Sequence, residues 1–98
     1  MASVRDLKKD IDLIMSMALS DCFYVMEYNN EVDEKAVYEI AGDIVKSHRE
    51  LRLRATHPDG KDNPKLVKQY YKEVVQDMLS AADAALERLS AEVKKVAK

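Results

Sequence analysis

The chain has 98 residues, of which 35% are charged and only two are glycine and two proline. This composition excludes a turn-rich sheet and a proline-rich disordered chain, and the length suits one domain whose interior is too small for a sizeable cofactor. The formal net charge of -2 gives no overall basic field for nucleic acid or anionic lipid. We therefore expect one all-α domain over residues 1–98, with no cofactor and no nucleic-acid partner.

Two further features bear on the location of the protein. The single cysteine, Cys22, cannot close an internal disulfide, so folding does not require an oxidising compartment. No stretch approaches the roughly 18 uninterrupted apolar residues of a membrane span. A lipoprotein signal ending at Cys22 would need basic residues followed by an apolar run, but Asp6, Asp10 and Asp12 stand in those positions. The expected location is the cytoplasm, with no membrane partner.

The first helix is predicted to begin at Ser3, whose hydroxyl can cap the backbone N–H of Asp6. Apolar residues then recur every three or four positions as far as Val25. After Ile11 the apolar surface widens to cover most of the cylinder, which is more than two neighbouring helices would bury. The candidate association surface on this helix consists of Met15, Met17, Leu19, Phe23 and Met26.

The second helix is predicted to follow a loop over residues 29–32, with Asp33 or Asn30 as its cap. Its apolar stripe includes His48, which antiparallel pairing with the third helix would place near Tyr71 or Lys72. A boundary histidine bonded to tyrosine is therefore expected rather than a metal ligand. Neither histidine has a glutamate three positions before it, so the sequence lacks the pattern of a di-iron bundle.

The third helix is predicted to start with Asn63 as its cap and Pro64 at its first position, and to run to about Val96. Its length of about 50 Å exceeds the roughly 40 and 35 Å of the other two. Two short loops favour an up-down-up bundle of three antiparallel helices. The excess is expected as an overhang of about 15 Å beyond Glu87, which either bends onto its own bundle or packs on a second copy. This overhang carries Leu89, Val93 and Val96.

The loop between the second and third helices contains His57, Pro58 and Asp59, followed by glycine. Proline, aspartate and glycine all suit turn positions, so a turn before a helix start explains the segment. The same three residues follow a basic helical half and resemble the His-Pro-Asp loop of chaperone J-domains. That resemblance implies a co-chaperone role and an Hsp70 as partner, although Thr56 stands where the family has an aromatic residue. The basic half contains Lys46, Arg49, Arg52 and Arg54.

The opening segment from Val4 to Ile11, together with the loop from His57 to Lys61, resembles small uncharacterised helical bacterial proteins. This second resemblance implies a helical fold and no particular activity. The broad apolar surface is too large for a comfortable monomer and indicates a homodimer. We therefore expect a non-enzymatic interaction or scaffold module that self-associates and can take a further protein partner. A degenerate J-like co-chaperone module is the alternative.

Overall fold

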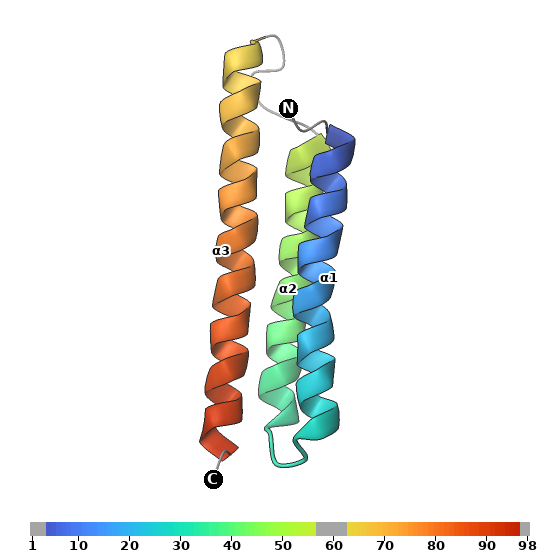
Figure 1. Cartoon of the computed structure of the whole chain (residues 1–98), viewed down its shortest axis with the longest axis vertical. Helices are drawn as coiled ribbons and strands as arrows, with labels where there is room; N and C mark the ends of the chain where they lie inside the picture. Colours follow the sequence, from blue (N-terminus) through green and yellow to red (C-terminus); the bar gives the residue numbers. More distant parts are fainter. Residues whose placement is uncertain (1–3, 57–62, 97–98) are drawn as a thin grey trace.

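Three helices account for the described part of the chain. The computed structural model describes residues 4–56 and 63–96. Helix α1 spans Val4–Tyr28, α2 spans Glu34–Thr56 and α3 spans Pro64–Val96. They lie side by side and alternate in direction (Figure 1), and no described residue belongs to a strand. The predicted all-α bundle of three long helices, with the third the longest, is confirmed.

Two of the predicted helix caps are present. The Asp33 carboxylate accepts a hydrogen bond from the backbone N–H of Lys35 at 3.0 Å, at the start of α2. The Asn63 side-chain oxygen accepts one from the N–H of Lys65 at 3.0 Å, at the start of α3. Each cap satisfies a backbone donor that the first helical turn leaves without a carbonyl partner. The cap predicted at Ser3 lies outside the described residues.

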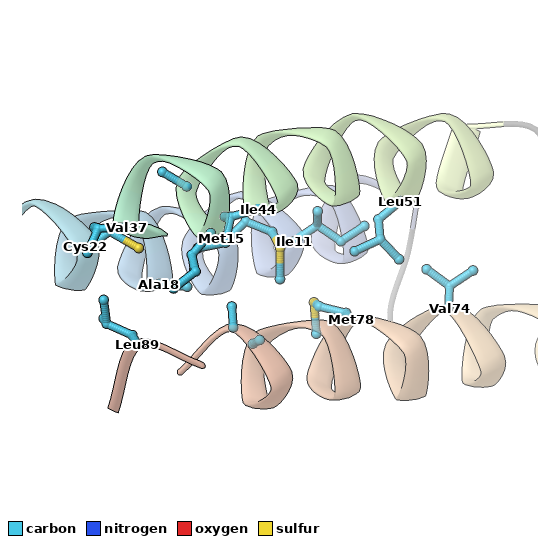
Figure 2. Close-up of a cluster of buried hydrophobic side chains, with 14 of the residues drawn as sticks. Ile11, Met15, Ala18, Cys22, Val37, Ile44, Leu51, Val74, Met78 and Leu89 are labelled. Atoms are coloured by element: carbon cyan, nitrogen blue, oxygen red, sulfur yellow. The ribbon is translucent and has the colours of Figure 1, made fainter. Parts of the chain in front are cut away.

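The core is formed by one apolar stripe from each helix, as the 3.6-residue period predicts. Figure 2 shows these side chains pointing into the space that the three helices share. Ile11, Val37 and Val74 are completely shielded from solvent. Burying one such side chain contributes about 1.5–3 kcal/mol, so the stripes are the main source of stability. The buried residues are Leu7, Ile11, Met15, Ala18, Cys22, Val32, Val37, Ile40, Ala41, Ile44, Leu51, Ala55, Val74, Met78, Ala82, Ala85 and Leu89.

Two ion pairs mark the register of α2 against α3. Arg54 Nη1 lies 2.7 Å from Asp77 Oδ2, and Arg88 Nη1 lies 2.6 Å from Asp43 Oδ2. The separation between the two α2 residues equals the separation between the two α3 residues, at three helical turns. Both pairs therefore belong to one antiparallel register, with the arginine on α2 in one pair and on α3 in the other.

The longest helix projects at the end opposite to the one predicted. The α2–α3 register puts Thr56 level with Val75, so the first turns of α3 extend beyond both other helices by about 15 Å (Figure 1). The C-terminal end of α3 stops near the level of the α1–α2 loop. Leu89 is only 4% exposed and belongs to the core, and Val93 and Val96 pack against it. The predicted C-terminal overhang is wrong, because it assumed that α3 starts level with the end of α2.

Candidate interaction surface

Asp12 of α1 forms contacts with two basic side chains of α2. His48 Nε2 lies 2.7 Å from Asp12 Oδ1, and Arg52 Nη1 donates to the two carboxylate oxygens at 2.6 and 2.5 Å. His48 and Arg52 are four residues apart on one helical face, so a single carboxylate reaches both. All three side chains are partly exposed. The cluster therefore lies at the outer edge of the α1–α2 contact rather than in the core.

The electrostatics of this cluster favour the ionised carboxylate. Hydrogen bonds from Arg52 and then from His48 hold the pKa of Asp12 below its ordinary value. The Asp12 side chain is 44% exposed, so water screens the interaction and keeps it from approaching the strength of a buried ion pair. The cluster can anchor one edge of the bundle and present an immobilised guanidinium to the surface.

Sequence reasoning missed this cluster. It treated Asp12 only as an interruption of an apolar run and placed His48 beside Tyr71 or Lys72. That placement is wrong, because the shift of α3 leaves both of those residues beyond the end of α2. The charge pattern could have revealed the cluster, because Asp12 is an acidic residue on α1 at the level of the basic half of α2.

A row of apolar side chains continues from the cluster along the α1–α2 contact. Leu19 and Phe23 follow Asp12 on the same side of α1, two and three turns later. On α2, Val45 and Tyr38 precede Arg52 by one and two heptads and so share its side of the helix. The Phe23 side chain is 51% exposed and that of Tyr38 is 57% exposed. The surface called here the α1–α2 face consists of Asp12, Leu19, Phe23, Met26, Tyr38, Val45 and Arg52.

A second apolar patch lies along α1 and α3. Leu13 and Met17 are exposed on a different side of α1 from Asp12. Leu79 and Leu86 are exposed on α3, one heptad apart, on the side opposite to the residues that pair with α2. Nearby on the same side of α1, the Tyr24 and Tyr28 rings lie 4.5 Å apart. The patch called the α1–α3 patch consists of Leu13, Met17, Leu79 and Leu86.

The contact between α2 and α3 carries a shallow groove that runs between the two ion pairs. It consists of two adjoining depressions of about 170 and 210 Å³, which share Ser47 and Ala81. Ligand pockets are commonly about 300–1,000 Å³ and enclosed, so neither depression has the size of a small-molecule site. At one end, Asp77 raises the pKa of Arg54, whose guanidinium carbon lies 5.8 Å from the centre of the Tyr70 ring. The groove is therefore part of the structural contact between α2 and α3 rather than a ligand site.

The predicted association surface on α1 is divided by the fold. Met17 and Phe23 are exposed, at 56% and 51%. Leu19 and Met26 are partly buried and pack against the core. Met15 is 1% exposed, so its inclusion is wrong, because it lies on the core stripe of α1. Leu89 is likewise enclosed by its own bundle.

The His57-Pro58-Asp59 segment lies outside the described residues. The basic helical half that precedes it belongs to α2. Lys46 and Arg49 are exposed there. Arg52 and Arg54 instead make ion pairs with carboxylates of α1 and α3. Half of the predicted basic surface is therefore engaged in holding the bundle together.

Cys22 is fully buried in the core, where it packs as a small apolar side chain. Burial raises the pKa of its thiol, and the nearby Asp21 carboxylate adds to the effect. Among the described residues, no three histidine, cysteine or acidic side chains are grouped so that they could hold a metal ion. None of the described helices is long and apolar enough to cross a bilayer.

Comparison with known proteins identifies no relative. The chain matches no family model, no curated protein and no solved structure. The function is therefore inferred from the exposed surfaces of the bundle, where the α1–α2 face and the α1–α3 patch concentrate large apolar side chains.

Proposed function

We propose that this protein is a helical interaction module that associates with a second copy of itself, rather than an enzyme. The observation that carries the proposal is the gathering of large exposed apolar side chains into patches. Phe23 and Tyr38 lie on one patch, and Met17 and Leu86 lie on the other. Monomeric proteins rarely keep extended apolar patches in contact with water, because covering them is favourable.

The residue types support the same proposal. Aromatic residues and methionine are enriched at the centres of protein interfaces relative to the rest of the surface. Tyr38 and Phe23 present rigid rings with few rotatable bonds, so ordering them on association costs little conformational entropy. A cytoplasmic location belongs to the same proposal, and it would be tested by fractionating cells that express the tagged protein.

Sedimentation equilibrium over a range of concentrations tests the proposal. We expect a reversible dimer at micromolar concentration, whereas a monomer would have a mass of 11.2 kDa. The double variant Met17→Ser with Phe23→Ser removes one exposed side chain from each patch and should weaken the dimer. Leu53→Ser is the matched control, because Leu53 is 58% exposed but lies in neither patch. A wild-type chain that remains monomeric at high micromolar concentration would overturn the proposal.

A further inference from the structure

The two ends of the α1–α2 face carry opposite charge. On the side of the Asp12 cluster, basic residues lie within two turns of Asp12 and Arg52 on the same edges of their helices. Those residues are Arg5, Lys8 and Arg49. At the other end, acidic residues flank Phe23 and Tyr38, and they are Glu27, Glu31 and Glu34. The formal net charge of -2 does not reveal that basic and acidic residues are separated along the bundle.

We propose that the α1–α2 face binds the same face of a second copy in the antiparallel orientation. This inference rests on the proposed self-association and specifies its surface and geometry. A parallel arrangement would bring basic end against basic end and acidic against acidic, which is repulsive. An antiparallel arrangement covers each basic end with an acidic end. The pair is then an isologous dimer in which the α1–α2 layers of the two copies stack face to face.

The spacing of the face suits a two-fold axis at its centre. Val45 lies one heptad from Tyr38 and one heptad from Arg52, so the two flanking residues are each about 10 Å from it along the helix. On α1, Leu19 is in the same way midway between Asp12 and Met26. We place the two-fold axis in the plane of the face, perpendicular to the helices and at the level of Leu19 and Val45. This axis sets each helix against the same helix of the other copy, and it brings residues on one side of the centre level with residues equally far on the other side. Tyr38 of one copy then faces Arg52 of the other.

This pairing gives the Asp12 cluster a role at the interface. Arg52 Nη1 is held at 2.6 Å from Asp12 Oδ1, so its guanidinium is already immobilised at the surface. A fixed guanidinium is a good partner for an exposed aromatic ring, because little further ordering is needed for a cation–π contact. The same two-fold axis sets α1 against α1 of the other copy, so Lys8 lies within one turn of the level of Glu27 of that copy, since the two residues lie eleven and eight residues from Leu19.

The α1–α3 patch is the competing surface. Its flanking charges do not separate by sign, because Asp10 and Lys72 lie toward one end and Asp21 and Lys94 toward the other. It therefore offers no electrostatic preference for one orientation of a second copy. The patch supplies the control residue Leu86, which is exposed to a similar degree as Val45.

Cysteine crosslinking tests the face. A residue next to the two-fold axis approaches its own copy, so Val45→Cys should form a disulfide-linked dimer under mild oxidation. Leu86→Cys should remain uncrosslinked under the same conditions. The native Cys22 is fully buried and should give no background in the wild-type chain. If Leu86→Cys crosslinks and Val45→Cys does not, the protein self-associates but the proposed face is wrong.

Charge reversal tests the orientation. Lys8→Glu and Glu27→Lys should each raise the dissociation constant by roughly tenfold at low salt, because each places like charges at two symmetric positions. The double variant should recover most of the lost affinity, since both pairs are then reversed. Circular dichroism confirms that each variant keeps the helicity of the wild type. An unchanged dissociation constant in both single variants would overturn the antiparallel pairing, and a monomeric wild type would overturn the self-association as well.

Discussion

The Asp12 carboxylate and the His48 imidazole meet at 2.7 Å across the contact between α1 and α2, at the edge of the bundle rather than in its core. Because Arg52 shares the same carboxylate, the contact fixes both the register and the rotation of α1 against α2. Asp12 and Arg52 also belong to the α1–α2 face. A single acidic residue thus links the stability of the helix pair to the surface that we propose for association.

Replacing Asp12 with asparagine should lower the free energy of unfolding by about 1 kcal/mol at pH 7, a value discounted for solvent screening. The physical reason is the loss of the charge-assisted hydrogen bonds to Arg52 and His48. Urea denaturation followed by circular dichroism measures the change. Asp83→Asn is the control, because Asp83 is exposed and lies outside the cluster. Equal effects of the two substitutions would mean that the cluster contributes nothing beyond the charge itself.

The lowered pKa of Asp12 gives this contribution a defined pH dependence. The folded pKa lies below the ordinary value of 3.8, so folding favours the ionised form. The stabilisation is therefore complete well above pH 3.8 and is lost as the pH falls toward the folded pKa. The difference in unfolding free energy between wild type and Asp12→Asn should shrink over this acid range. A difference that stays constant down to pH 2 would contradict the assigned ionisation.

The sequence predicts the local structure of this bundle better than the relative position of its helices. Apolar period and cap chemistry are local properties, so the helix bounds and the caps at Asp33 and Asn63 could be predicted directly. The shift of α3 involves contacts between residues distant in the sequence, such as Arg54 with Asp77, which a periodic pattern does not encode. The overhang and the environment of His48 were mispredicted for this one reason.

The two helix caps should differ in their effect on stability although their hydrogen bonds are alike. Asp33→Ala should lower the free energy of unfolding by about 1 kcal/mol, because α2 starts beside the buried Val32. Asn63→Ala should cost less than half as much, because the first turns of α3 project beyond the other helices and can fray without opening the core. Urea denaturation compares the two variants. Equal losses would show that the projecting turns unfold together with the bundle.

Cys22 should report global unfolding. Its thiol is fully buried and burial raises its pKa, so both access and thiolate formation are suppressed in the folded chain. A thiol-specific reagent at pH 8 should therefore label the native protein far more slowly than the urea-unfolded protein. The labelling rate should rise across the same urea range as the loss of helicity. Rapid labelling without urea would show that the bundle opens locally around α1.

The end of α3 provides the sharpest test of the corrected register. Leu89 is buried between the three helices, so Leu89→Ala should lower the free energy of unfolding by about 2–5 kcal/mol. The matched control is Leu86→Ala, since Leu86 is 38% exposed one turn earlier and should cost much less. Truncation after Arg88 should likewise destabilise the monomer, because it also removes Val93 and Val96 from the edge of the core. Circular dichroism in urea separates this result from the alternative, in which truncation leaves stability unchanged and only weakens association. That alternative would restore an unsupported C-terminal end of α3 and would contradict the α2–α3 register that the Arg88 and Asp43 ion pair marks.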